Sequence, residues 1–184
     1  MVLVAFSVDF VAVGFFFYSY GVFFTAIAKE FGDSELGAML GSHLGASLGL
    51  TITHAVGAIA APLVGRALDR FPLRRVIAAG ALAMSSGFLL LSQVRSLLAF
   101  YLVIGVFIGF GASSMGNLAT SKLVTNWFDK RRGMALGIAA AGVSLSGVVM
   151  PNVSAYLIES FDWRFGFSVF GLFTLFAVVP LVLR

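Results

Sequence analysis

Six long runs of apolar residues alternate with short charged segments along this chain. Each run approaches or exceeds the roughly 20 residues that a helix needs to cross a hydrocarbon layer about 30 Å thick. The pattern therefore predicts an all-α membrane protein with six transmembrane helices in a single domain, residues 1–184. The expected helices cover residues 3–28, 36–64, 76–93, 97–125, 133–158 and 165–183.

The composition supports a membrane protein and excludes several other classes. Hydrophobic residues make up 60% of the chain and charged residues 11%, whereas soluble domains carry roughly 25% charge. The lipid bilayer is the expected partner, and a nucleic acid is not, because the basic pI reflects scarce acids and membrane-flanking Lys/Arg. We expect no cofactor. No metal site is expected either, because the chain has no cysteine and its two histidines lie on one helix without nearby carboxylates.

The basic residues are divided unevenly between the two sides that the six helices define. Nine lie on one side and three on the other, and an excess of Lys/Arg marks the cytoplasmic side. The N-terminus is then cytoplasmic, in the plasma membrane or a bacterial inner membrane. The nine are Arg66, Arg70, Arg74, Arg75, Lys122, Lys130, Arg131, Arg132 and Arg184, and the three are Lys29, Arg95 and Arg164.

Glycine recurs at short spacing within three of the predicted helices. Small residues separated by three or four positions let helix backbones approach closely in lipid. Helix packing is the plain interpretation of these stripes, and they predict a compact bundle. The positions expected to pack are Gly41, Gly45, Gly49, Gly137, Gly142 and Gly147.

Polar side chains inside the predicted spans are candidates for a substrate or proton pathway, because such groups are costly in lipid. Asp9 and Tyr20 are eleven residues apart and fall near one face of the first helix. His43 and His54 have the same spacing in the second helix. A histidine titrates near neutral pH and is suited to carry a proton. The structural alternatives are an interfacial carboxylate for Asp9 and packed, hydrogen-bonded rings for the histidines.

Two further candidates lie towards the inner end of the fourth helix. Asn117 could hydrogen-bond a substrate, and Lys122 could attract an anion. The alternative for Lys122 is a lysine whose ammonium reaches the cytoplasmic surface. The aromatic run at residues 15–18 is expected to pack or to contact lipid.

The segment between the second and third helices has a distinctive sequence, Gly65-Arg66-Ala67-Leu68-Asp69-Arg70-Phe71, followed by Arg74-Arg75. It resembles the signature loop of the major facilitator superfamily. It departs from that pattern at Ala67 and Leu68, where the order of leucine and small residue is reversed, and at Pro72 and Leu73. The resemblance implies that Gly65, Asp69, Arg70, Arg74 and Arg75 form a conformational brace on the cytoplasmic side.

A second segment is more specific. Residues 127–142, which include the cytoplasmic loop Lys130-Arg131-Arg132-Gly133, are similar to the monocarboxylate transporter and oxalate:formate antiporter branch. Residues 20–24 and 162–167 also resemble that branch. The arginine that many antiporters of the superfamily carry in the fourth helix is replaced by Gly105.

The resemblance implies a fold of two six-helix halves with substrate bound between them, so six helices correspond to an N-terminal half. The C-terminal half, or a second copy, is the expected partner. The implied function is secondary transport by alternating access of a small monocarboxylate or other organic anion, with a proton or by exchange. A drug or sugar carrier of the same superfamily and a non-transporting truncated fragment are the alternatives.

Two other functions fit the residues poorly. An intramembrane serine protease pairs the serine of Gly-x-Ser-Gly with a histidine on a later helix. Here residues 144–147 lack the leading glycine and both histidines come earlier. An aquaporin-like channel needs Asn-Pro-Ala half-helix loops, which residues 150–153 do not provide. We therefore expect a carrier and not an enzyme.

Overall fold

The computed structural model describes residues 2–31, 35–128 and 131–183, with side chains for all of these except 35–43 and 46. Within those ranges six helical segments are long and apolar enough to cross a membrane. This confirms the prediction of a six-helix, all-α membrane protein. The segments are Val2–Phe31, Ser47–Arg70, Leu73–Leu91, Leu97–Trp127, Arg132–Ser160 and Trp163–Leu183.

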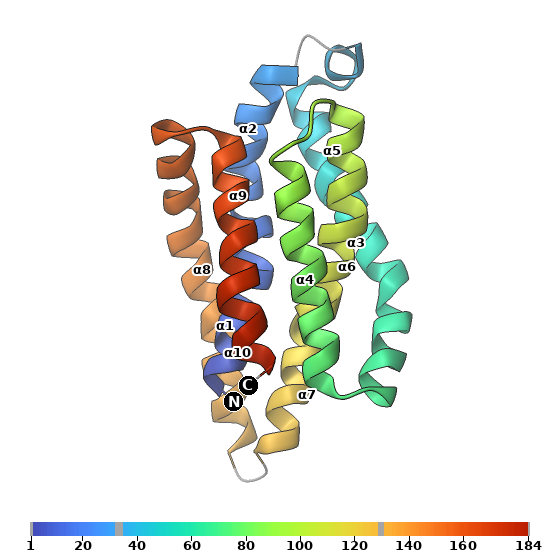
Figure 1. The fold of residues 1–184 in the computed structure, drawn as a ribbon, viewed down its shortest axis with the longest axis vertical. Coiled ribbons are helices and arrows are strands. Elements are labelled where there is room, and N and C mark those ends of the chain that lie inside the picture. The colour runs from blue at the N-terminus through green and yellow to red at the C-terminus, as the bar shows by residue number, and fades with distance from the viewer. Residues whose placement is uncertain (1, 32–34, 129–130, 184) are drawn as a thin grey trace.

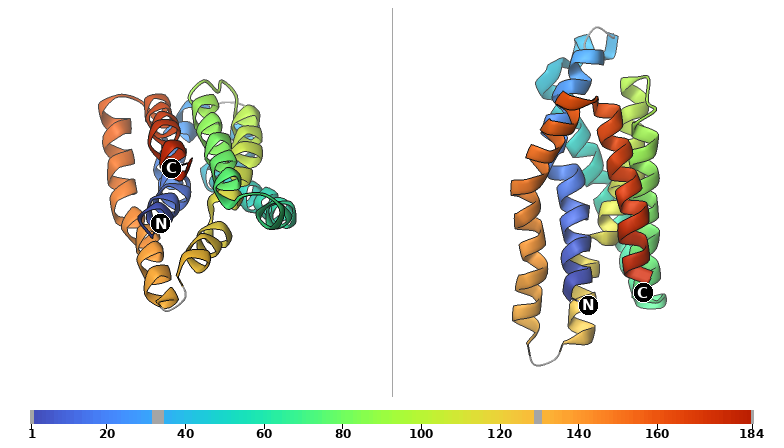
Figure 2. Two further views of the ribbon diagram at one scale, coloured as in Figure 1. Left: turned by 60° about the horizontal axis from the view of Figure 1, so that its bottom comes forward. Right: turned by 60° about the vertical axis from the view of Figure 1, so that its left-hand side comes forward.

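The spans stand side by side as an upright bundle, and the two ends of the chain lie at the same end of it (Figure 1). We call this the Asp69 end and the other the Glu30 end. Figure 2 shows the same bundle from two further sides. The first three spans comprise α1 (Val2–Val13), the π-helical η1 (Gly14–Tyr18), α2 (Tyr20–Phe31), α3 (Glu35–Arg70) and α4 (Leu73–Leu91). The other three comprise α5 (Leu97–Val103), η2 (Ile104–Gly109), α6 (Phe110–Met115), α7 (Asn117–Trp127), α8 (Arg132–Ser160), α9 (Trp163–Phe173), η3 (Thr174–Val178) and α10 (Val179–Leu183).

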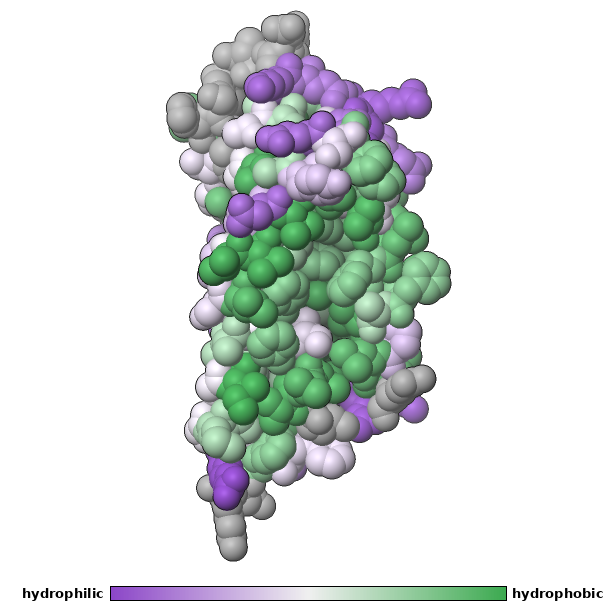
Figure 3. Space-filling model, turned by 90° about the vertical axis from the view of Figure 1, so that its left-hand side faces the viewer, coloured by the Kyte–Doolittle hydropathy of each residue, from purple (hydrophilic) through white to green (hydrophobic). Residues whose placement is uncertain are grey.

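The outer surface has a broad apolar belt between two polar ends. Figure 3 shows this belt on the side of α8 and α9, with hydrophilic residues gathered at the top and bottom. Large side chains such as Phe176 (73% exposed) and Tyr156 (66% exposed) contribute to the exposed apolar surface. Apolar surface of this extent suits contact with lipid chains or with another membrane domain.

The structure differs from the sequence-based prediction at the end of the second helix. That helix was expected to stop at residue 64 and to be followed by a charged loop, but α3 continues to Arg70 and α4 begins at Leu73. Only Phe71 and Pro72 separate the two helices. Charged residues do not end a helix that has already left the hydrocarbon layer, whereas a proline disfavours helical backbone at the residue before it.

The fourth span is also less regular than the hydrophobic pattern predicts. It is interrupted at Gly116, whose φ of −68° and ψ of −170° end α6 and start α7. A Cβ at this position would lie 2.7 Å from the carbonyl oxygen of Ala112. Glycine therefore permits a break within a segment that reads as one apolar run.

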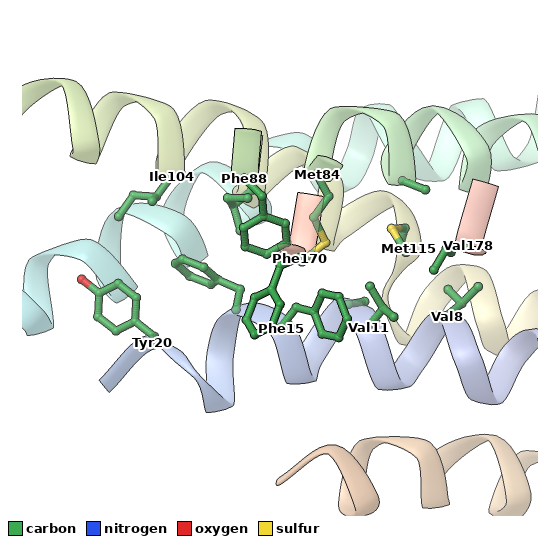
Figure 4. Packing of buried hydrophobic residues seen from close by; sticks show 14 of the residues in the cluster. Val8, Val11, Phe15, Tyr20, Met84, Phe88, Ile104, Met115, Phe170 and Val178 are labelled. Atoms are coloured by element: carbon green, nitrogen blue, oxygen red, sulfur yellow. The ribbon is translucent and has the colours of Figure 1, made fainter. Parts of the chain in front are cut away.

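The interior is dominated by phenylalanine side chains from the first, third and sixth spans. The rings of Phe15 and Phe170 stack at 4.4 Å between centroids, and those of Phe23 and Phe167 at 4.3 Å. Phe88 of α4 lies between these pairs, and Figure 4 shows it facing Phe15 and Phe170. The aromatic core thus holds the first, third and sixth spans together.

The predicted packing glycines fall into two groups. A Cβ at Gly142 would lie 2.5 Å from the Phe6 carbonyl oxygen, and one at Gly147 would lie 3.2 Å from the Tyr18 ring. These positions therefore bring α8 close to the first span. Gly137 differs, because a Cβ there would meet nothing within 4 Å. Gly41 lies outside the residues whose side chains are described.

Candidate functional site

An aromatic and imidazole group lies at the middle of the first span. The exposed ring of His54, on α3, stacks on Phe17 of η1, with 4.9 Å between centroids and 22° between planes. Phe17 is near the centre of the Val2–Phe31 span. Substrates of transporters built from helical repeats bind near the membrane midplane. His54 and Phe17 therefore lie near the middle of the bundle's length, the depth at which such sites are found.

Tyr18 lies on the other side of the same π-helical turn. Tyr18 is 42% exposed, and its ring lies against the Gly147 position of α8. Single π-helical turns inside α-helices are frequent at functional sites. Here η1 turns Phe17 towards α3 and Tyr18 towards α8, while Phe15 and Phe16 remain buried. The aromatic run at residues 15–18, which was expected to pack or to contact lipid, therefore contains two buried residues, Phe15 and Phe16, and two more accessible ones, Phe17 and Tyr18.

We define the substrate face as His54, Phe17 and Tyr18. It offers two hydrogen-bonding groups, an imidazole and a phenol, beside an aromatic wall. An imidazole can carry a positive charge near neutral pH, and a phenol can donate to an oxygen. This chemistry suits a small organic anion with an apolar part. His43, the other predicted histidine, lies outside the residues whose side chains are described.

Tyr20 is buried and not part of that face. It is 3% exposed, and its hydroxyl has no hydrogen-bond partner among the described atoms. The hydroxyl occupies space that a Cβ at Gly49 of α3 would take, and Figure 4 shows it directed away from the aromatic core. Nearby, the Tyr101 hydroxyl donates to the Gly45 carbonyl at 2.9 Å. Gly45 and Gly49 thus make room for two tyrosine hydroxyls against α3.

Asp9 is likewise buried, at 3% exposure, and faces a different neighbour. The hydroxyl of Thr120, in the first turn of α7, interacts with its carboxyl group. Asp9 Oδ1 has no hydrogen-bond partner among the described atoms. Asp9 therefore lies against the fourth span and Tyr20 against the second, so the polar stripe expected on the first helix is divided between two helix contacts.

Lys122 and Asp69 form an ion pair at the Asp69 end, which we call the inner clamp. The Lys122 ammonium donates to Asp69 Oδ1 at 2.5 Å and to the Leu68 carbonyl at 2.9 Å. The contact joins the end of α3 to α7. Asp69 remains 76% exposed, so its carboxylate is open to a further partner. Asn117, the other candidate in this span, is exposed at the start of α7.

The remaining residues of the two basic segments lie at the same end. Gly65 has open space where a Cβ would be, and Arg70 and Arg75 are exposed. Arg74 has a bonding partner within the chain. In the second segment Arg132 Nε donates to the Phe128 carbonyl at 2.8 Å, and Arg131 and Gly133 are exposed. Lys130 lies outside the described residues.

A second ionic contact, the outer clamp, closes the Glu30 end and was not predicted from the sequence. Arg164 donates to both carboxylate oxygens of Glu30, at 2.7 and 2.8 Å, and Trp163 Nε1 donates to the same carboxylate at 2.7 Å. The Arg164 guanidinium also reaches the Val94 carbonyl at 3.2 Å. One arginine thus links α2, the α4–α5 connection and α9. The only sequence signal was an acid at the end of one span and an arginine at the start of another.

Comparison with known proteins gives one family and several relatives. The Major Facilitator Superfamily model matches residues 8–184. Monocarboxylate transporter 3 of Rattus norvegicus is 33% identical over 82% of this chain, and monocarboxylate transporter 4 of the same species is 35% identical over 60%. The uncharacterised MFS-type transporter YcxA of Bacillus subtilis is 28% identical over 65%. These matches cover 29%, 23% and 29% of the respective relatives, so the chain spans under a third of their length.

A solved structure agrees with the fold. The chain superimposes on a crystal structure of a mutant of the peptide transporter POT in complex with alafosfalin, with a TM-score of 0.77 and 19% identity. The match covers 99% of this chain and 37% of the other. The six spans therefore have the arrangement found in part of that larger carrier.

Proposed function

The chain belongs to the Major Facilitator Superfamily, and we propose that it supplies one half of a secondary transporter that works by alternating access. This family consists of transporters and not of enzymes. The observation that carries the proposal is the substrate face. It places His54 and Phe17 in contact beside α3, and the adjacent Tyr18 beside α8, at mid-span; α3 and α8 are the two spans with the least burial within the described chain. A second half facing these helices would enclose a site at the midplane.

The proposed substrate is a small monocarboxylate or another organic anion. Two considerations support it: the relatives that are named monocarboxylate transporters, and the donors of the substrate face. A carboxylate would accept hydrogen bonds from the Tyr18 hydroxyl and from a protonated His54, and its apolar part would contact Phe17. Charge-assisted hydrogen bonds of this kind are about twice as strong as neutral ones.

Transport is coupled to a proton or proceeds by exchange of two anions. Asp9 is the candidate proton site, because an ionisable group inside a span marks an ion or proton path by default. Its Oδ1 is available, having no partner among the described atoms. His54 is the second candidate. A proton on either residue would add one positive charge to the half that binds the anion.

The inner clamp sets the conformation of the Asp69 end. Lys122 holds Asp69 at the end of α3, and the exposed carboxylate can then contact the second half when that end closes. Arg70 and Arg74 lie on the same helix junction and would reinforce this contact. In the proposed orientation this end and the N-terminus are cytoplasmic, in the plasma membrane or a bacterial inner membrane. The second half is a further part of the polypeptide or a second copy.

Uptake into proteoliposomes tests the proposal. The complete protein from its source membrane would be reconstituted and given an inward proton gradient with labelled lactate, glucose or a cationic drug. We expect lactate to accumulate and a protonophore to abolish the accumulation. Accumulation of glucose or the drug instead would favour the alternative carriers. No uptake of any substrate, either under the proton gradient or with unlabelled lactate inside the vesicles, would favour a non-transporting protein.

A further inference from the structure

A cavity of about 370 Å³ lies at the Asp69 end, between the last turns of α3, the start of α4 and α6. Seven of its nine lining residues are apolar, among them Leu63, Phe71 and Phe110. The other two are Arg75 and Ser114. The surface exposed in the cavity is almost entirely apolar, so the cavity is an apolar slot beside one exposed cation.

This cavity shares no lining residue with the substrate face. The substrate face lies where η1 meets α3 and α8, whereas the slot lies between α3 and α4. Leu63, Phe71 and Phe110 are 62%, 60% and 39% exposed. In a bilayer such side chains border lipid, so a lipid chain can enter between them.

The cation stands where a lipid headgroup would be. Arg75 is in the first turn of α4 and is exposed, and no side-chain bond engages its guanidinium in the part of the chain that the structure describes. Arg66 and Arg70, at the end of α3, are also exposed. Basic pockets between transmembrane helices bind anionic headgroups, and each Lys/Arg near the surface contributes about 1 kcal/mol.

The other polar residue that lines the slot, Ser114, is buried. Ser114 is 1% exposed, and its Oγ has no hydrogen-bond partner among the described atoms. It packs at Gly80, five residues beyond Arg75 on α4, which corresponds to about 7.5 Å along a helix. The Ser114 hydroxyl is thus covered by the chain, and the surface that a ligand would meet in the slot is apolar.

We propose that this cavity binds one acyl chain of an anionic phospholipid. The phosphate pairs with the exposed guanidinium of Arg75 beside the slot. The acyl chain lies among the apolar residues between α3 and α4. The lipid would thereby hold together the two helices whose junction follows Asp69. This inference does not depend on which substrate is transported.

Photo-crosslinking tests it on the complete protein in nanodiscs. The probe is a phosphatidylglycerol with a diazirine on one acyl chain, diluted in phosphatidylcholine. We expect labelled peptides that include Ala79 or Phe110, and competition by unlabelled phosphatidylglycerol but not by added phosphatidylcholine. Arg75→Gln should lower labelling about fivefold, and Ala79→Phe, which fills the cavity, should abolish it.

Two matched variants control for general effects. Arg95→Gln removes an exposed arginine at the Glu30 end, and Ala177→Phe enlarges an exposed alanine of η3. Both should leave the labelling unchanged. Size-exclusion profiles of all variants show whether they fold. For folded variants, equal labelling by a phosphatidylcholine probe or unchanged labelling in Arg75→Gln would overturn the proposal. A crosslink from a photoreactive residue at position 79 to the second half would mean that protein fills the slot, and would also overturn it.

Discussion

Lys122 on α7 holds Asp69 at the end of α3, across 53 positions in the sequence, at 2.5 Å between ammonium and carboxylate. Lys122 was a candidate for the substrate pathway, and Asp69 was expected to brace the cytoplasmic side. Their ion pair joins the end of α3 to α7, so both residues belong to the inner clamp. The pair is partly exposed, at 35% for Lys122 and 76% for Asp69, so its direct contribution to stability is about 1 kcal/mol or less.

Asp69→Asn should therefore affect transport much more than stability. We expect uptake by the complete protein to fall about fivefold or more, a typical size for coupling between conformational states, while membrane insertion and thermal stability stay near wild type. Uptake and the unfolding temperature would be measured in parallel. The charge-swapped pair Asp69→Lys with Lys122→Asp should recover part of the activity. Wild-type uptake by Asp69→Asn would remove the role assigned to the clamp.

The outer clamp should depend on the planar shape of arginine. Arg164→Lys keeps the charge but cannot donate to both Glu30 oxygens as the guanidinium does. Because these side chains are 32% and 41% exposed, we expect a loss of about 1 kcal/mol in the free energy of unfolding. Arg95→Lys, at an exposed arginine of the same end, is the control. An equal effect of both substitutions would argue against a specific clamp.

Gly142 should be the least replaceable of the predicted packing glycines on α8. A Cβ there would press on the backbone carbonyl of Phe6, which cannot move without shifting α1. Gly142→Ala should destabilise the protein by about 1–3 kcal/mol, as overpacking does. Gly137→Ala, where a Cβ meets open space, should be tolerated. Thermal unfolding in detergent compares the two, and equal stability would contradict the close contact of α1 and α8.

His54 should set the pH dependence of substrate binding. A proton on the imidazole would add a positive charge to the substrate face, so anion exchange at equal pH on both sides should depend on the pH. His54→Ala should flatten this profile. Phe17→Leu, which removes the stacked ring and keeps the imidazole, should preserve its slope. An unchanged profile in His54→Ala would make His54 a packing residue.

The sequence predicts the spans better than their interruptions. Hydropathy and length identify six crossing helices, because lipid demands apolar side chains over a fixed thickness. The break at Gly116 and the π-helical turn at η1 change backbone hydrogen bonds without changing hydropathy. The only sequence feature that marks either interruption is a glycine, Gly14 for η1 and Gly116 for the break. Glycines in membrane helices are also explained by helix packing.

The candidate site could likewise be predicted only in part from the sequence. The polarity of Asp9, Tyr20, His54 and Lys122 marked them as unusual inside spans, but spacing on a single helix does not decide which neighbour each one meets. Lys122 meets Asp69 across 53 positions, and Arg164 meets Glu30 across 134. Such pairs depend on how the six spans are arranged, and the periodicity of residues along one helix carries no information about that arrangement.

Counterflow in proteoliposomes tests most directly whether this chain forms half of an organic-anion carrier. Vesicles containing the complete protein would be loaded with unlabelled lactate and diluted into labelled lactate at equal pH on both sides. We predict a transient, saturable accumulation of label that requires lactate inside the vesicles and is reduced in the double variant His54→Ala, Tyr18→Phe. Label that only equilibrates, at a rate independent of internal lactate, would contradict alternating access at this face.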